Sequence, residues 1–147
     1  MDRGPAVLLT VFAGGLIALQ APINSMLGRS VGTFTAASVS FTVGTLALVA
    51  ITLIVGEGFG RVGEARNLAP YYLAGGILGA VYVTTALVAV RALGAGGVTA
   101  ATITGQLLTA VIVDRLGLLG VTERPLSAQR LIGVALLAAG TFLVVRE

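Results

Sequence analysis

Long runs without a charged residue fill almost the whole chain, and they limit its possible folds more than any other feature. The runs span residues 4–28, 30–56, 67–90, 92–113 and 131–145. An α-helix of ~20 apolar residues crosses a hydrocarbon core about 30 Å thick. The first four runs reach that length, and the fifth does so if residues 126–129 are added and Arg130 and Arg146 extend to the interfaces. Since lipid offers the backbone no hydrogen-bond partners, each run is predicted to be a helix.

The fold class that follows is an all-α integral membrane protein with five transmembrane helices in a single domain, 1–147. The helices are expected over approximately 5–27, 34–56, 70–90, 95–116 and 127–146. Pro5 and Pro70 fit this division, because proline is favoured in the first turn of a helix. The links 28–33 and 91–94 are short, so the helices that each one joins should be antiparallel neighbours.

The composition argues against an enzyme and against a metal or cofactor. Only 10% of the residues are charged, whereas soluble domains carry about 25%, so no stretch is left for a separate soluble domain. The sequence has no His and no Cys, which removes the usual ligands of zinc, haem and iron–sulfur centres. It also removes the side chains of thiol and His-based catalysis. We therefore expect no catalytic residue, no metal site and no cofactor.

The arginines indicate topology and not nucleic-acid binding. On the N-terminal side of the membrane the five helices would place Arg3, Arg61, Arg66, Arg115, Arg124 and Arg130. On the opposite side they would place Arg29, Arg91 and Arg146. The excess favours a cytoplasmic N-terminus, but it is weak, so insertion in both orientations stays open. Arg29 and Arg91 either attract anions at an entrance or simply anchor helix ends.

Gln20, Pro22 and Asn24 interrupt the apolar run of the first expected helix. Gln20 and Asn24 are four residues apart and should share one face. Pro22 cannot donate to the carbonyl of Ala18, so an acceptor is freed nearby. Broken or kinked helices near the midplane form the binding sites of many transporters, and two amides with a free carbonyl suit a polar ligand. The alternative is that the amides only hold helices together through hydrogen bonds.

Three further polar residues are candidates for function. Gln106 is a third amide within an expected helix, and Tyr82 lies in mid-span, where its hydroxyl needs a partner. Asp114 follows Gln106 by eight residues and shares its face. Because ionisable groups inside a membrane are functional candidates, Asp114 is a possible coupling residue; alternatively, it ends the helix at the interface beside Arg115. Most Ser and Thr hydroxyls are expected to bond the backbone of their own helix.

Polar and glycine residues recur in a distinctive order along all five expected helices. The first two carry Gly14-Gly15, Gln20, Asn24, Leu27-Gly28, then Ala37, Ser40-Phe41 and Gly44-Thr45. The others carry Gly75-Gly76, Gly79-Ala80, Tyr82-Val83, then Gly105-Gln106, Asp114-Arg115-Leu116-Gly117, then Arg130-Leu131, Gly133 and Gly140. Over essentially its whole length the chain resembles the YdcZ-like (DUF606) half-size members of the drug/metabolite transporter superfamily.

The resemblance implies half of a ten-helix transporter fold, assembled as an antiparallel dimer with a second copy or with a paired homologue. It implies a transporter in the inner (cell) membrane of a bacterium or archaeon but does not identify the ligand. The leading hypothesis is a secondary transporter of small polar metabolites or drug-like molecules. Alternating access would occur at a midplane site lined by Gln20, Asn24, Tyr82 and Gln106 of both protomers, with Asp114 as a possible coupling residue. The expected partners are the small-molecule substrate, membrane lipids and the second subunit, and no nucleic acid.

Two other functions remain open. Small dual-topology proteins also form ion channels, but a channel should show a continuous polar stripe, whereas the polar positions here are sparse and interrupted by Pro22. The chain could also be a non-transporting membrane subunit that stabilises another protein.

Small multidrug transporters of four helices use a Glu in their first helix for proton coupling, and this chain has Gln20 and Asn24 there instead.

Overall fold

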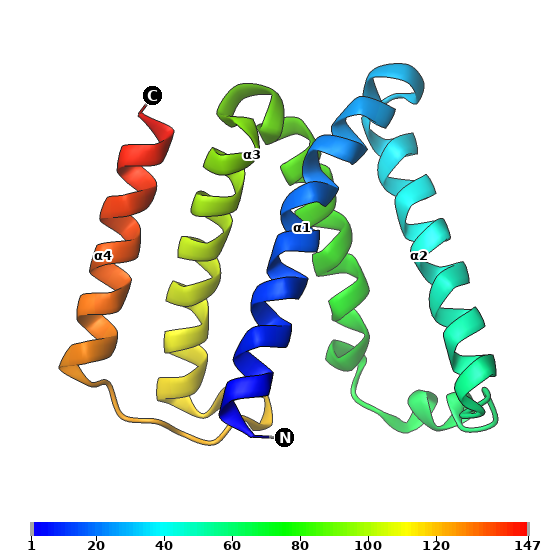
Figure 1. The fold of residues 1–147 in the computed structure, drawn as a ribbon. Helices are drawn as coiled ribbons and strands as arrows, with labels where there is room; N and C mark the ends of the chain where they lie inside the picture. The colour runs from blue at the N-terminus through cyan, green and yellow to red at the C-terminus, as the bar shows by residue number, and fades with distance from the viewer. Residues whose placement is uncertain (1, 147) are drawn as a thin grey trace. The chain divides into compact units, whose positions relative to one another are not determined.

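The computed structural model describes residues 2–146, and most of this stretch is helical. Its long helices are α1 (Arg3–Val31), α2 (Thr33–Val55), α3 (Ala74–Leu116) and α4 (Ala128–Val145), labelled in Figure 1. Short 3-10 helices lie in the links: η1 (Val62–Asn67), η2 (Pro70–Leu73) and η3 (Leu118–Gly120). Residues 2–146 contain no β-strand, so the all-α prediction is confirmed.

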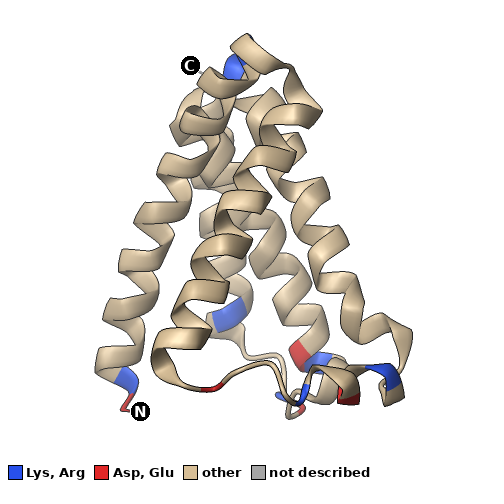
Figure 2. Cartoon of the chain, turned by 90° about the vertical axis from the view of Figure 1, so that its right-hand side faces the viewer, with Lys and Arg blue, Asp and Glu red and all other residues tan. Residues whose placement is uncertain are grey.

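Within the described residues, four helical stretches are long and apolar enough to cross a membrane. They are Arg3–Val31, Thr33–Val55, Pro70–Leu116 and Ala128–Val145. Charged residues lie mainly at the helix ends and in the links (Figure 2). Large apolar side chains are exposed along the helices, including Leu8 at 72% and Ile54 at 84%. Apolar surface this extensive is unfavourable in water but is covered by lipid tails in a bilayer, so this is a multi-pass membrane protein.

α3 is interrupted at Gly94. Its φ of 68° and ψ of 173° lie outside the helical region, in a conformation that glycine adopts far more readily than other residues. The break falls within the link expected at 91–94 and leaves one helix before it and one after it. The prediction that these two parts cross the membrane separately, which makes five spans in a single domain, stays a prediction.

Pro22 does not end α1, which continues as a single helix from Arg3 to Val31. Its ring still leaves the carbonyl of Ala18 without the usual backbone donor four residues later. The helix expected over 5–27 therefore passes through Pro22 without a break, whereas α3 is interrupted at Gly94.

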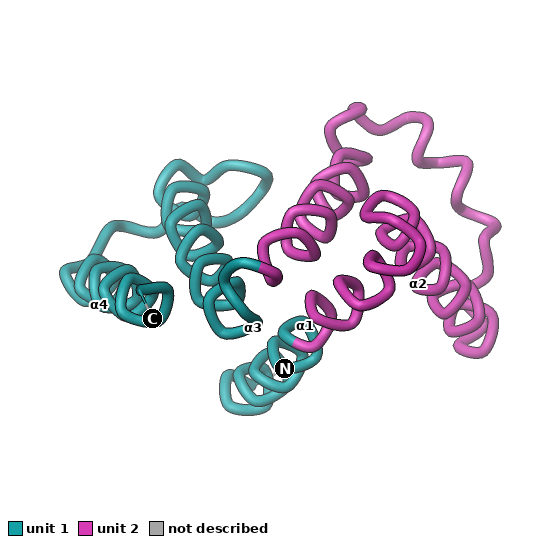
Figure 3. The backbone as a smooth tube through the Cα atoms, turned by 90° about the horizontal axis from the view of Figure 1, so that it is seen from above, with its two compact units in different colours: residues 1–18, 92–147 teal, residues 19–91 magenta. Residues whose placement is uncertain are grey.

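The chain divides into two compact units, which Figure 3 shows in different colours. Unit 1 comprises Met1–Ala18 and Ala92–Glu147, and thus the start of α1, the second part of α3 and all of α4. Unit 2 is Leu19–Arg91, with the end of α1, all of α2 and the first part of α3.

In unit 2, small residues of α1 pack against apolar residues of α3. α1 buries Ala21, Asn24, Ser25 and Gly28, whose spacing of three and four residues defines one helix face. α3 contributes Val83, Ala86 and the fully buried Leu87. A Cβ atom at Gly28 would lie 3.4 Å from Leu87, so the glycine lets α1 and α3 approach closely.

α2 joins unit 2 through a tight link and a close contact. A single residue, Gly32, separates α1 from α2, and its φ of 91° is one that side chains rarely allow. Farther along α2, the ring of Phe41 lies against Gly79 of α3, where a Cβ atom would be 3.3 Å from it.

After α2, Glu64 accepts two hydrogen bonds from Arg61 and raises the pKa of that exposed guanidinium.

In unit 1, the second part of α3 and α4 are antiparallel neighbours (Figure 1). The hydroxyl oxygens of Thr104 and Thr141 are 2.6 Å apart, and Thr141 also donates to the carbonyl of Ala100. Nearer the end of α3, Asp114 is bonded to Arg130 at the start of α4. Ala100, early in the second part of α3, contacts Thr141 late in α4, whereas Asp114, near the end of α3, contacts Arg130 early in α4. The two helices therefore run in opposite directions.

Candidate functional site

Asn24 stands out because a polar group in its side chain is buried and unsatisfied. The residue lies on the buried face of α1 in unit 2 and is only 5% exposed. Its amide nitrogen Nδ2 has no hydrogen-bond partner among the described residues. Buried polar groups are nearly always hydrogen-bonded, so an exception requires an explanation. A missing acceptor, supplied by a ligand, is one such explanation.

Gln20 lies one turn before Asn24 on α1 and lines a small cavity. The cavity has a volume of about 220 Å³ and lies wholly within unit 2. Its lining consists of Gln20, Ser40, Phe41, Gly44, Thr45 and Leu48. The structure therefore places the two amides predicted in the first helix on successive turns of one unit, with Gln20 exposed and Asn24 buried.

The other predicted site residues are distributed over both units. Tyr82 is half-buried on α3 in unit 2, next to the buried Val83. Gln106 lies on the second part of α3 in unit 1 and is exposed. Gln20, Asn24 and Tyr82 thus belong to one compact unit, whereas Gln106 belongs to the other. The four-residue substrate site stays a prediction.

Asp114, the possible coupling residue, is engaged by Arg130. Its carboxylate oxygen Oδ2 lies 2.6 Å from Nη2 of Arg130, and the two side chains are 23% and 32% exposed. Close by, Arg115 forms an ion pair with Glu123, and the backbone N–H of Arg124 donates to the carbonyl of Asp114. A coupling role for Asp114 therefore requires its bond to Arg130 to open.

The hydroxyl groups of several Ser and Thr residues bond the backbone of their own helix, as predicted. Each donates to the carbonyl four residues earlier, and the residues are Thr10, Ser38, Thr42, Thr52, Thr99 and Thr104. Because these hydroxyl protons are already committed, the residues are poorer candidates for ligand binding than the unpartnered Asn24.

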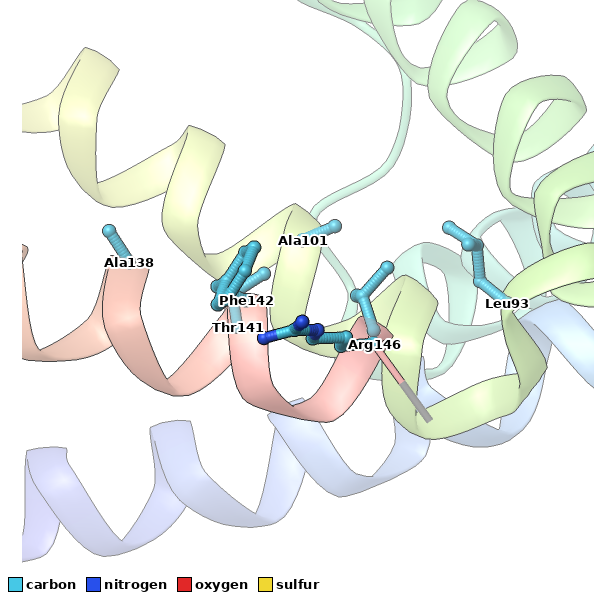
Figure 4. A pocket seen from close by; sticks show the side chains of 7 residues that line it. Leu93, Ala101, Ala138, Thr141, Phe142 and Arg146 are labelled. Carbon is cyan, nitrogen blue, oxygen red and sulfur yellow. The ribbon is translucent and has the colours of Figure 1, made fainter.

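Two cavities in unit 1 are almost entirely apolar. One of about 410 Å³ is lined by Leu93, Ala101, Ala138, Thr141, Phe142, Val145 and Arg146 (Figure 4). The guanidinium of Arg146 lies 5.5 Å from the centre of the Phe142 ring. The other, of about 560 Å³, is formed by α3 and α4 with Ala18 of α1. Their shared Thr141 is already hydrogen-bonded, so both cavities suit lipid tails or apolar side chains better than a polar ligand.

Two residues of unit 2 that were not predicted as site residues also contribute polar groups. Ser25, 5% exposed, accepts a hydrogen bond of 3.2 Å from Nε of Arg91. The sequence signal for Arg91 was its position at the end of a charge-free run, but that position is equally typical of a helix anchor. Ser25 gave no signal beyond its place beside Asn24.

Comparison with known proteins gives one result. The model of the family described as "Putative inner membrane exporter, YdcZ" matches residues 5–143. The searches of curated proteins and of solved structures found no match. The family match includes nearly all of α1 and α4 and the whole of α2 and α3, and it confirms the resemblance seen in the sequence. It describes a class of membrane transporters and not a known class of enzymes. The chain therefore belongs to the YdcZ family and is a multi-pass protein of the inner membrane.

Proposed function

We propose that this protein is a secondary transporter that exports small polar molecules by alternating access. The observation that carries the proposal is the buried amide nitrogen of Asn24, which has no partner within the described chain. Leaving such a donor unsatisfied costs about 1–3 kcal/mol. An acceptor on a bound substrate would offset this cost, and the family description as an exporter supports the direction of transport.

The proposed substrate site is centred on unit 2. Asn24 would donate to the substrate, while Gln20, at the cavity one turn away, would bind a second polar group. Tyr82 would contribute its hydroxyl from α3. Gln106, which lies in unit 1, stays a prediction as the fourth substrate residue of the assembled dimer. Asp114 would couple transport to a proton only if its ion pair with Arg130 opens during the cycle.

We further propose that the working unit is an antiparallel dimer, formed with a second copy or with a paired homologue. Two features support this assembly. The arginine distribution is only weakly biased between the two predicted sides, which permits insertion in both orientations. A chain with so few buried residues also benefits from a partner when it must enclose a polar pathway through lipid.

Flux through purified protein tests the transport proposal. Proteoliposomes would be loaded with a panel of small polar metabolites, and their efflux measured with and without the same solute outside. Saturable efflux that is stimulated by solute on the opposite side is expected for alternating access. Linear flux, or single-channel current, would instead indicate a channel. Absence of any flux would indicate a non-transporting subunit.

A matched pair of variants tests the role of Asn24. Asn24→Leu keeps a side chain of similar size but removes the amide, and it should reduce the saturable flux by tenfold or more, which corresponds to about 1.4 kcal/mol. Thr52→Val removes a hydroxyl that bonds only its own helix, so it serves as the control. Equal flux in the two variants would remove Asn24 from the substrate site.

A further inference from the structure

Arg91 is a cation held in place by contacts with α1. It is the last residue of unit 2 along the chain and is itself exposed. Its Nε donates to the hydroxyl of Ser25, and Ser25 is 5% exposed. One edge of the guanidinium is thus fixed by a buried group, while Arg91 as a whole residue is exposed.

Gly28 provides the space that this guanidinium occupies. A Cβ atom at Gly28 would lie 3.1 Å from Nη2 of Arg91, closer than an ordinary contact. The guanidinium therefore lies against the backbone of α1 at the one position of this face without a side chain. Ser25 and Gly28 act together as positioning residues, the first through a hydrogen bond and the second through space.

The charge of Arg91 is not balanced within the described chain. The ion pairs among residues 2–146 are Arg61–Glu64, Arg115–Glu123 and Arg130–Asp114. The α-helical parts of unit 2 carry two charged residues, Arg29 and Arg91, and both are positive. With Nε engaged by Ser25, Nη1 and Nη2 remain as a pair of parallel donors, the arrangement that binds a carboxylate or phosphate through two oxygens.

A second unsatisfied donor lies on the same face of α1. Asn24 and Gly28 are four residues apart, so the unpartnered amide of Asn24 is on the turn adjoining the one that Arg91 covers. Both groups present N–H donors. A ligand that satisfies them must carry several acceptor oxygens, as a carboxylate or phosphate does, and its negative charge would balance Arg91.

We propose that Arg91 recognises an anionic group of the transported molecule, so that the substrate is a small organic anion with a carboxylate or phosphate. The inference rests on the proposed transport function and names its substrate class. Arg91 binds two oxygens of the anion end-on, and Asn24 donates to a further oxygen. An anionic lipid headgroup offers the same chemistry, and the experiment distinguishes the two sources.

The first experiment measures binding and needs no flux. Protein labelled with 15N in its arginine side chains is placed in phosphatidylcholine nanodiscs and titrated with inorganic phosphate and with acetate. The Arg91 signal is identified by its loss in Arg91→Lys. A saturable shift of this signal is expected, without one at Arg66, which lies in the exposed link. No saturable shift with either anion, or equal shifts at all arginines, would overturn the proposal.

Three variants test the proposed geometry. Asn24→Leu should weaken anion binding at Arg91 about tenfold, because a hydrogen bond to a charged group is lost. Gly28→Ala keeps every donor but displaces the guanidinium by a few tenths of an ångström. The anion affinity should therefore fall several-fold, less than in Asn24→Leu. Gly75→Ala, where a Cβ atom would meet open space, is the matched control. Unchanged affinity in Asn24→Leu and Gly28→Ala would overturn the assignment.

Lipid and flux measurements separate the remaining alternatives. If the Arg91 signal responds to added phosphatidylglycerol but to neither free anion, Arg91 belongs to a lipid-binding site and the substrate inference fails. In proteoliposomes, Arg91→Lys and Arg91→Gln should abolish saturable anion flux, while Arg66→Gln retains it. Saturable flux of neutral solutes alone, unaffected at Arg91, would leave the transport function intact and overturn the anion inference. Anion binding without flux of any solute would contradict the transport function and leave the binding site supported.

Circular dichroism shows whether each variant retains its helix content. Arg91→Lys keeps the positive charge but removes the paired donors and the Nε bond to Ser25, and of the Arg91 variants it is the less prone to misfold. If it folds and isothermal titration calorimetry shows that it binds phosphate as tightly as the original chain, two-oxygen recognition by Arg91 is wrong.

Discussion

Arg130 donates a hydrogen bond of 2.6 Å to the carboxylate of Asp114, and this contact ties the start of α4 to the end of α3. Nη1 of the same guanidinium is buried without a partner among the described residues, so Arg130 has more donors than its surroundings use. The acid that the sequence offers as a coupling residue is thus part of the packing of unit 1. Any role for it in coupling has to include the breaking of this contact.

Replacing Asp114 should destabilise unit 1. Asp114→Asn leaves Arg130 without its ionic partner in a half-buried position, and we expect the free energy of unfolding to fall by about 1–3 kcal/mol, less than for a fully buried pair. Thermal unfolding of the purified protein, followed by circular dichroism, measures the change. Asp114→Asn combined with Arg130→Gln should recover part of the loss. A single variant as stable as the original chain would show that the ion pair is negligible.

The hydroxyl contact between α3 and α4 should also contribute to stability. Thr141→Val removes the hydroxyl that contacts Thr104 and the carbonyl of Ala100, and a hydrogen bond between membrane helices contributes about 0.6–2 kcal/mol. Thr10→Val is a suitable control, because Thr10 bonds only the backbone of α1. Unfolding in detergent should occur at lower temperature for Thr141→Val than for the control. Equal unfolding temperatures would contradict the prediction.

The interruption of α3 should depend on glycine at one position. Gly94→Ala places a side chain on a residue with φ of 68°, which costs about 1–3 kcal/mol even though nothing lies within 4 Å of the new Cβ atom. Gly75→Ala, in a helical and open position of the same element, should be neutral or stabilising by up to about 1 kcal/mol. Chemical denaturation of both variants tests this difference in sign. A Gly94→Ala protein with unchanged stability would show that the backbone there readily adopts another conformation.

The orientation of the chain in the membrane can be measured because the sequence has no Cys. Glu57→Cys introduces a single thiol in the link after α2, and intact cells are labelled with a membrane-impermeant reagent before and after lysis. If the dimer is antiparallel and formed from identical chains, similar labelled and protected fractions are expected. One accessible state would fix a single orientation and favour a paired homologue as the partner.

The sequence by itself determined the secondary structure and the class of protein. Runs of apolar residues predict membrane helices because lipid leaves the backbone no other way to satisfy its hydrogen bonds. The interruption of α3 fell within the link expected at 91–94, since charge and clustered glycines mark it locally. The hydrogen bonds of hydroxyl groups such as that of Thr42 were also predictable from local sequence, because each carbonyl partner lies only four residues away.

Only the tertiary structure decided which polar residues are buried and what they contact. Gln20 and Asn24 look equivalent in sequence, yet only Asn24 lies on the face that packs against its neighbours. The pairs Ser25–Arg91 and Asp114–Arg130 join residues 66 and 16 positions apart, and no local pattern specifies them. Pro22 removes one backbone hydrogen bond, and α1 continues through it as the expected helix over 5–27 does. Such contacts depend on how whole helices are placed, and that placement arises from the packing of all small and large side chains together.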